Sequence, residues 1–270
     1  MDDIREKRIF GGKEGRIRLF VGTELGVVVA SLSGPRVGEF GLEYRTPVRD
    51  IAGAPGRIVV ATNEDVTLLG EEPVDLGVGP ASAVGFDGED VIAGDDGGRV
   101  VRVDAEGVDE IGTTEGAVTA IDGALVGTEG GVYRVIDNEL VAAGLDRVRD
   151  IDARGTPLAA TETGLYRLGN GWMTLHEGDA AAVTSDGGGR RHAVIDNTLY
   201  TASPDGDRWA PVRLPVDKTP LDIAYGDRTS IVTAEGTVLV EADDGWRHQR
   251  LGVGGVVGCA VATEYGTRDI

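Results

Sequence analysis

The chain carries one ten-residue pattern twice, as LVGTEGGVYR over Leu125–Arg134 and as LAATETGLYR over Leu158–Arg167. Tyr133 in the first copy marks a position that recurs at intervals of 32 to 39 residues. Its counterparts are Val28, Thr67, Val101, Tyr166, Tyr200 and Leu239. Self-similarity at a nearly constant period indicates a repeat architecture, here with a unit of about 35 residues.

Each unit reads as four short strands. A stretch such as Val48–Ile51, Val148–Ile151 or Pro220–Ile223 comes first, and an apolar run rich in Val and Ile follows it. The marker strand and a more polar last strand complete the unit. Continuous apolar runs suit strands that are buried on both faces, and the 43 glycines punctuate the chain too often for helices of useful length.

Repeated four-stranded antiparallel units around an axis define a β-propeller. Helical repeats of similar period need amphipathic helices, and the sequence contains no segment with that pattern. A two-sheet sandwich would not explain the internal repetition. We therefore expect an all-β fold with seven four-stranded blades.

The tryptophans support this register independently. Trp172, Trp209 and Trp246 are the three tryptophans of the chain, and they are 37 residues apart both times. Each follows a Gly- or Asp-containing turn. The spacing predicts that each indole begins an outer strand and packs between neighbouring blades.

The two ends of the chain should close the ring. Val261–Gly266 repeats the beginning of another unit, and then the sequence stops. An open propeller would expose a strand edge, so we expect C-terminal and N-terminal strands to pair in a shared blade. An eighth blade formed by residues 4–12 and 255–266 is the alternative. In either case residues 1–270 should form one domain.

The composition is strongly acidic. The chain has 46 Asp and Glu against 26 Lys and Arg, a net charge of −20, and its only lysines are Lys7, Lys13 and Lys218. Such a surface repels itself at low ionic strength, and molar salt screens the repulsion. An acid-rich, lysine-poor composition resembles that of cytoplasmic proteins from extreme halophiles. It also disfavours nucleic acid and anionic membranes as partners, because both need a basic surface.

The N-terminal sequence lacks an apolar signal core, and no segment approaches 18 consecutive apolar residues. Cys259 is the single cysteine, which excludes an intramolecular disulfide and suggests a small buried residue near the closure. These features predict a cytoplasmic protein.

Two resemblances follow from the residues. The units around Val118–Arg134 and Val148–Leu168 are similar to the propeller repeat of two-component regulators, which implies a fold much more than a function. The whole chain resembles a family of haloarchaeal β-propellers. The shared features are Glu6–Gly11, Phe20–Thr23 and Val37–Phe40, and the resemblance implies no particular activity.

One inward-facing position of the first strand carries candidate chemistry. It is occupied by Asp50, Ala83, Ala120, Asp150, Ala182 and Asp222. Three carboxylates among small residues could ring the axial channel and bind a hydrated cation, because hard cations prefer oxygen ligands. Arg49 and Arg149 stand beside two of them, and strand alternation should turn these arginines away from the Asp face. In the alternative, the aspartates cap turns or line a wet channel without a specific ligand.

Other chemistry has little support. His176, His192 and His248 fall on different units and do not form the convergent set that zinc requires. No catalytic residue is predicted, because neither a Gly-x-Ser-x-Gly elbow nor a phosphate-binding loop occurs. No cofactor is indicated.

The sequence thus favours a non-enzymatic cytoplasmic propeller that binds a protein partner or a small ligand. The alternative is a hydrolase or lyase that acts in the channel through an acidic axial site able to bind a metal ion.

Overall fold

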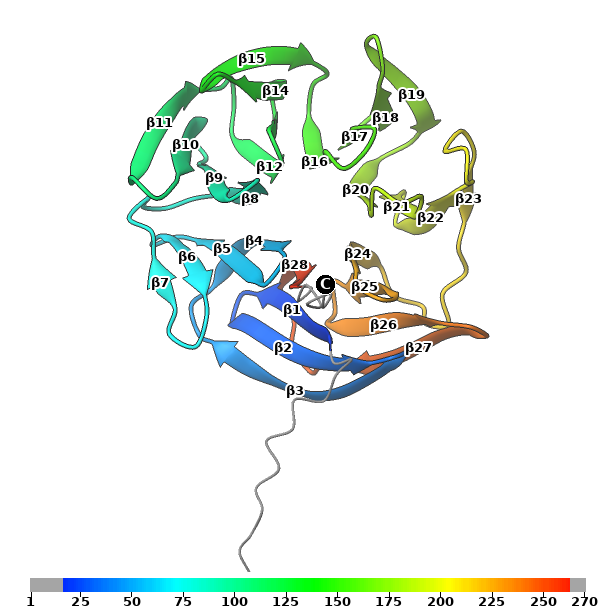
Figure 1. Ribbon diagram of the computed structural model, residues 1–270. Coiled ribbons are helices and arrows are strands. Elements are labelled where there is room, and N and C mark those ends of the chain that lie inside the picture. The colour runs from blue at the N-terminus through cyan, green and yellow to red at the C-terminus, as the bar shows by residue number, and fades with distance from the viewer. Residues whose placement is uncertain (1–16, 263–270) are drawn as a thin grey trace, which may run out of the picture.

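Residues 17–262, which the computed structural model describes, form a ring of seven four-stranded antiparallel sheets around a central axis (Figure 1). Every marker residue lies on the third strand of its blade, counted outward from the axis. The seven-bladed β-propeller that the repeats predict is therefore confirmed. Residues 4–12, considered for an eighth blade, lie outside the described part of the chain.

Blade 1 contains both ends of the described chain. From the axis outward its strands are β28 (Val256–Val261), β1 (Ile17–Thr23), β2 (Gly26–Ser33) and β3 (Arg36–Tyr44).

The other six blades follow one another along the chain. From the axis outward, blade 2 contains β4 (Val48–Ala54), β5 (Arg57–Thr62), β6 (Val66–Leu69) and β7 (Val74–Asp75), and blade 3 contains β8 (Ala83–Asp87), β9 (Asp90–Gly94), β10 (Arg99–Val103) and β11 (Val108–Thr113). Blade 4 contains β12 (Val118–Asp122), β13 (Leu125–Thr128), β14 (Gly131–Ile136) and β15 (Glu139–Gly144), and blade 5 contains β16 (Val148–Asp152), β17 (Leu158–Thr161), β18 (Gly164–Leu168) and β19 (Trp172–Glu177). Blade 6 contains β20 (Ala180–Ser185), β21 (Arg191–Ile195), β22 (Thr198–Ala202) and β23 (Trp209–Pro211), and blade 7 contains β24 (Pro220–Tyr225), β25 (Thr229–Thr233), β26 (Thr237–Ala242) and β27 (Gly245–Arg250).

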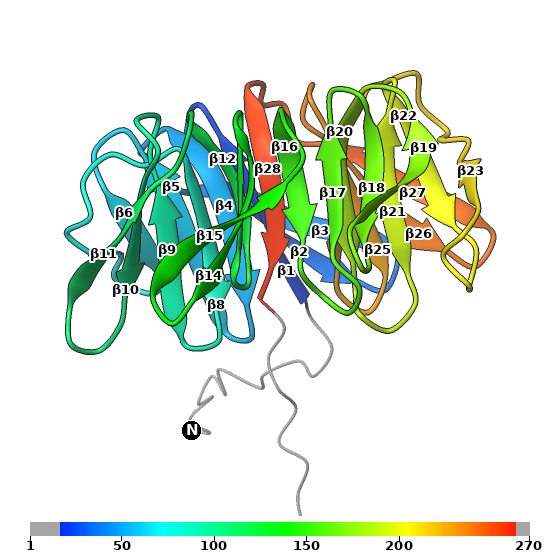
Figure 2. The ribbon, with the colours of Figure 1, turned by 90° about the horizontal axis from the view of Figure 1, so that it is seen from above.

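The ring closes through β28 and β1. These strands pair antiparallel, with Leu19 opposite Val261 and Val21 opposite Cys259. The last strand of the described chain thus supplies the inner strand of blade 1, and no open sheet edge separates the first blade from the last. The start of β1 and the end of β28 lie on the same face of the ring (Figure 2).

The core consists of seven apolar clusters, one in each seam between neighbouring blades. β5 shows why its sequence is continuously apolar. Ile58 and Val60 pack in the seam with blade 1, whereas Val59 and Ala61 pack in the seam with blade 3. Because both faces of the strand are buried, the alternation of polar and apolar residues disappears.

The tryptophans occupy the predicted places. Trp172, Trp209 and Trp246 lie on the outer strands β19, β23 and β27, and each packs into the seam with the preceding blade. The Trp172 indole Nε1–H also donates a hydrogen bond to the Ala143 carbonyl of that blade, at 2.8 Å.

A β-bulge recurs in six of the inner strands. The extra residue, which has no partner on the neighbouring strand, is Arg49, Thr119, Arg149, Ala181, Leu221 or Val257. In β4, Val48 and Ile51 both pack on the preceding blade although they are three residues apart. Regular alternation would place them on opposite faces, so the inserted residue restores the match. Asp50 between them consequently faces the following blade.

At some seams the inner strands of neighbouring blades lie so close together that only glycine fits between them. A methyl group at Gly85 in β8 would lie 2.4 Å from the Ile121 carbonyl oxygen in blade 4. We predict that Gly85→Ala lowers the free energy of unfolding by about 1–3 kcal/mol, because the two strands must move apart. Gly41→Ala, on an exposed stretch of β3 with no atom near the added methyl group, should change it by less than about 0.5 kcal/mol. Chemical denaturation of both variants in molar salt measures the difference, and equal stabilities would contradict the packing of this seam.

Candidate functional site

An axial channel passes through the ring. It encloses about 1080 Å³ and is lined by residues from all seven inner strands. The inner strands run in the same direction, so one end of the channel carries the bulge residues and the other carries the strand ends. We call these the bulge end, defined by Arg49, Thr119, Arg149, Ala181, Leu221 and Val257, and the terminal end, defined by Asp122, Asp152 and Arg154.

Asp50, Asp150 and Asp222 lie in the channel lining, one residue inward from the bulge end. All three carboxylates make the same two contacts. Oδ1 accepts the backbone N–H of the next residue, and Oδ2 accepts a backbone N–H from the inner strand of the following blade. The bonds of Oδ2 reach Val84, Val183 and Cys259, at 2.8, 2.7 and 2.7 Å.

These bonds satisfy a row of amides that no strand can pair. Each inner strand is the edge of its sheet, and its outward N–H groups face the channel. At this level three aspartates bind the amides of six blades, namely Ile51, Val84, Ile151, Val183, Ile223 and Cys259. The equivalent residue in the remaining blade, blade 4, is Ile121, which follows Ala120 and therefore has no aspartate beside it. The aspartates therefore join neighbouring blades.

The channel environment disfavours negative charge. Burial raises the pKa of Asp50 to about 6. Burial and the nearby Asp222 carboxylate raise the pKa of Asp150 well above its usual value. The pKa of Asp222 is also raised by burial. Among the described residues, none of these three carboxylates forms an ion pair within 4.0 Å, so their charge is not neutralised by a basic side chain.

Arg49 and Arg149 line the bulge end, but their guanidinium groups turn toward acidic side chains: Asp96 and Asp179 next to or within the following blade, and Glu162 in the blade of Arg149 itself. Arg49 forms two 2.7 Å hydrogen bonds with the Asp96 carboxylate. Arg149 lies 2.7 Å from Asp179 and 3.8 Å from Glu162. The arginines and the aspartates thus line the same channel, but the guanidinium groups are engaged by other acidic side chains.

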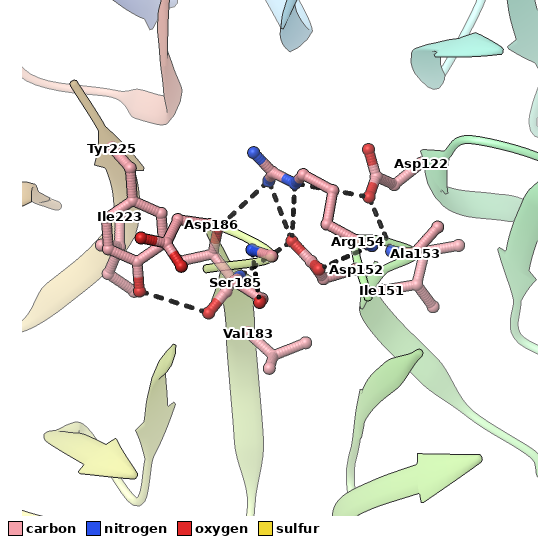
Figure 3. A network of polar contacts seen from close by, with 12 residues as sticks. Asp122, Ile151, Asp152, Ala153, Arg154, Val183, Ser185, Asp186, Ile223 and Tyr225 are labelled. Atoms are coloured by element: carbon pink, nitrogen blue, oxygen red, sulfur yellow. Dashed lines mark hydrogen bonds and ion pairs between the residues drawn. The ribbon is translucent and has the colours of Figure 1, made fainter. Parts of the chain in front are cut away.

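The terminal end holds a second polar network (Figure 3). Arg154 donates from Nε and Nη2 to Asp152 Oδ2, at 3.2 and 2.9 Å, and from Nη2 to Thr184 Oγ1, at 3.3 Å. Its side chain is nevertheless 53% exposed to the channel. Asp122 Oδ2 lies 3.9 Å from Arg154 Nε and accepts the Ala153 N–H at 2.6 Å.

Asp152 is the most deeply held carboxylate of this network. It is 1% exposed, and its Oδ2 also accepts the Ser185 N–H of the following blade, at 2.9 Å. Burial raises its pKa to about 6, and burial likewise raises the pKa of Asp122. Asp122 and Asp152 therefore repeat, two residues further along the strand, the link between blades that Asp50 makes.

Tyr225 extends the network toward blade 7. Its hydroxyl donates to the Thr184 carbonyl at 3.3 Å and lies 2.7 Å from His192 Nδ1. Because the hydroxyl proton is used for Thr184, His192 donates from Nδ1. Burial lowers the pKa of His192 to about 4, so the imidazole is neutral. Arg190 covers the Tyr225 ring, with its guanidinium carbon 4.8 Å from the ring centroid.

Within residues 17–262, no group of three His, Cys, Asp or Glu side chains has an arrangement that could hold a metal ion. His176 and His248 lie on outer strands, as predicted. Cys259 is buried beside Asp222, and burial raises the pKa of its thiol. In that described range, no helix has the length and hydropathy of a membrane span.

Four residues of this site were not predicted from the sequence: Asp122, Asp152, Arg154 and Tyr225. A signal for two of them existed, because Asp122 and Asp152 occupy the same position of their repeats, two residues after Ala120 and Asp150. The convergence of Arg154, Thr184 and Tyr225 depends on three different blades and has no counterpart in the repeat pattern.

The ring and its channel define a β-propeller, a class of fold that serves as a scaffold or binding module. The chain belongs to the family described as HVO_0234-like beta propeller, whose model matches residues 3–262. The predicted resemblance to a haloarchaeal propeller family is therefore confirmed. A comparison with the curated proteins finds no match.

Solved structures share the fold at low sequence identity. A chain of the nidogen/laminin complex is 12% identical with a TM-score of 0.62, and the match covers 92% of this chain and 98% of that one. Virginiamycin B lyase from Staphylococcus aureus is 11% identical with a TM-score of 0.62, over 76% and 85% of the two chains. The computationally designed Ika8 protein is 13% identical with a TM-score of 0.64, over 92% and 91%. At these identities the likeness concerns the fold alone.

The role of Asp150 between blades can be tested by Asp150→Asn. One amide nitrogen would then face a backbone N–H donor, so we expect a loss of about 1–3 kcal/mol in the free energy of unfolding. Asp179→Asn removes an exposed carboxylate that pairs with Arg149, and it should cost less than about 1 kcal/mol. Urea denaturation of both variants provides the measurement, and a smaller loss for Asp150→Asn would overturn its assignment as a link between blades.

His192 should make the fold sensitive to acid. Its pKa is about 4 in the folded protein against 6.5 when unfolded, so the folded state binds fewer protons between these values. The contribution of His192 to the free energy of unfolding should fall as the pH drops from about 6.5 to 4, by up to about 3 kcal/mol. Asp50 and Asp152, whose pKa values rise to about 6 in the folded protein, contribute in the opposite direction. His192→Asn keeps a polar partner for Tyr225, and over this pH range it should lose less stability, or gain more, than the wild-type protein. The exposed His248→Asn should retain the wild-type slope in denaturation at several pH values, and an unchanged slope in His192→Asn would refute the assignment.

Proposed function

We propose that this protein is a non-enzymatic binding module that holds a small polar ligand in its axial channel. The observation that carries the proposal is a cavity of about 1080 Å³ with ionisable side chains at both ends. Ligand sites in proteins commonly enclose about 300–1,000 Å³ and present a few fixed polar groups. Hydrogen bonds between blades fix the carboxylates here, so a ligand would meet a preorganised site.

The outer surface gives less support to a role as a protein-interaction scaffold. Five exposed large apolar side chains lie on the outer strands of five different blades: Phe40, Val74, Val108, Val141 and Met173. Interaction surfaces are usually contiguous apolar patches, whereas these residues are distributed around the ring. The channel is the feature that concentrates ionisable groups.

The alternative is a hydrolase or lyase that acts in the channel. A carboxyl group with a pKa of about 6, such as Asp152 beside Arg154, is the observation that favours it. The oxygens of Asp152 already accept bonds from Arg154 and Ser185. Those of Asp50, Asp150 and Asp222 accept backbone amides. These contacts leave the carboxyl groups poorly placed for proton transfer, so binding is the better-supported role.

A cytoplasmic location and adaptation to molar salt stay predictions. They rest on the excess of 46 acidic over 26 basic residues and on the single cysteine.

Blocking the channel tests the proposed function. Ala181 is exposed at the bulge end and lines the channel, so Ala181→Trp should fill the opening with little effect on the core. We expect compounds from a panel of cationic, neutral and anionic polar metabolites to raise the melting temperature of the wild-type protein in molar KCl. The same compounds should have no effect on Ala181→Trp.

Val74→Trp is the matched control, because Val74 is exposed on the outer strand β7. It should respond to the panel as the wild-type protein does. The proposal is refuted if no compound shifts the wild-type melting temperature, or if Ala181→Trp responds equally. Turnover in a hydrolase and lyase panel that Asp152→Asn abolishes would establish the alternative instead.

A further inference from the structure

The opening at the bulge end is apolar on one side. Ala181, Leu221 and Val257 stand on the consecutive inner strands β20, β24 and β28 and line the channel. Val257 is 37% exposed. These three side chains, the apolar arc, occupy the bulge position that carries Arg or Thr in three other blades. Ala181 and Val257 are exposed and belong to none of the seam clusters, whereas Leu221 is half-buried and packs at the edge of the cluster between blades 7 and 1.

Immediately inward of the apolar arc the channel is lined by three carboxyl groups. Asp222 follows Leu221 on β24, while Asp50 and Asp150 lie at the same level on β4 and β16. As described above, these carboxylates have no ion-pair partner among the described residues. Arg49 and Arg149, at the same end, are already neutralised by Asp96 and Asp179.

We infer that the bulge end binds an aliphatic ammonium group, whose methylene chain packs on the apolar arc and whose charge lies among Asp50, Asp150 and Asp222. This inference rests on the proposed function and names its ligand class. Charge complementarity favours a cation, because a buried carboxylate that lacks a counter-charge is stabilised by a positive charge placed beside it. The apolar arc favours a ligand whose charge is carried on an apolar stem. Lysine side chains pack in the same way, because their methylene groups cover apolar surface while the charge stays in a polar environment.

The contacts of the carboxylates also favour ammonium over a chelated metal ion. Each oxygen already accepts one backbone N–H, and the aspartates do not converge as metal ligands. A carboxylate oxygen has a second lone pair, which can accept one of the three donors of an ammonium group without breaking the link between blades.

Isothermal titration in molar KCl and at lower salt tests the inference with four probes. They are n-pentylammonium, n-pentanol, pentanoate and the peptide acetyl-Gly-Lys-Gly amide. We expect n-pentylammonium to bind roughly tenfold more tightly than n-pentanol, and pentanoate to bind more weakly than either. If the peptide binds more tightly than n-pentylammonium, the ammonium group belongs to a lysine side chain of a partner. If n-pentylammonium binds more tightly, the ligand is a small amine.

Two variants place a competing ammonium group at the opening. Val257→Lys, with Leu221→Lys as the second variant, should weaken n-pentylammonium binding roughly tenfold by occupying the site from within. Val74→Lys adds the same charge to an exposed outer strand and should change the affinity by less than about twofold. Circular dichroism confirms that each variant is folded.

The outcomes separate the inference from the function on which it rests. The ammonium site is overturned if n-pentanol or pentanoate binds as tightly as n-pentylammonium, or if neither Val257→Lys nor Leu221→Lys changes the affinity for n-pentylammonium. In both cases the channel remains a binding site. Failure of n-pentylammonium alone has the same meaning if other compounds of the metabolite panel bind. If no compound binds, both the inference and the proposed function are wrong.

Discussion

The structure depends on how the exposed edges of the inner strands are satisfied. A propeller leaves the inner strand of every sheet unpaired on its axial side, and the amides of that edge cannot be left without partners. In this protein a carboxylate at one position accepts its neighbour's amide and one amide from the following blade. Asp50, Asp150 and Asp222 do this at one level, and Asp122 and Asp152 extend the same link between blades at the next. Hydrogen bonding and blade assembly are therefore achieved by the same residues.

This solution determines the character of the channel. Joining blades with carboxylates concentrates negative charge in a partly buried cavity, where the pKa values of the aspartates rise. Basic side chains at the two ends do not cancel that charge, because Arg49 and Arg149 pair with other acids and Arg154 pairs with Asp152. Carboxyl groups without a basic partner are thus a consequence of the architecture, and a cationic ligand would stabilise their ionised form.

The fold was predictable from sequence because its signals are local and repeated. The marker residues, the apolar second strands and the spaced tryptophans each report one blade, and seven consistent units leave little freedom in the architecture. The candidate ring of Asp50, Asp150 and Asp222 was found for the same reason, since a repeat position can be compared between units. Arg154, Thr184 and Tyr225 were not found, because their contact joins three blades. None of these three residue types recurs at the equivalent position of another blade.

The propeller ring, with seven blades expected and eight as the alternative, its closure and the position that carries the aspartates could all be predicted from the sequence. All of these follow from periodicity, since an approximately constant spacing of apolar strands and turns requires like-shaped sheets. The tertiary structure decided what the aspartates contact and which residues share the channel. Those properties depend on the bulge that turns Asp50 toward the following blade and on the distances between inner strands, and neither is encoded in the spacing of one repeat.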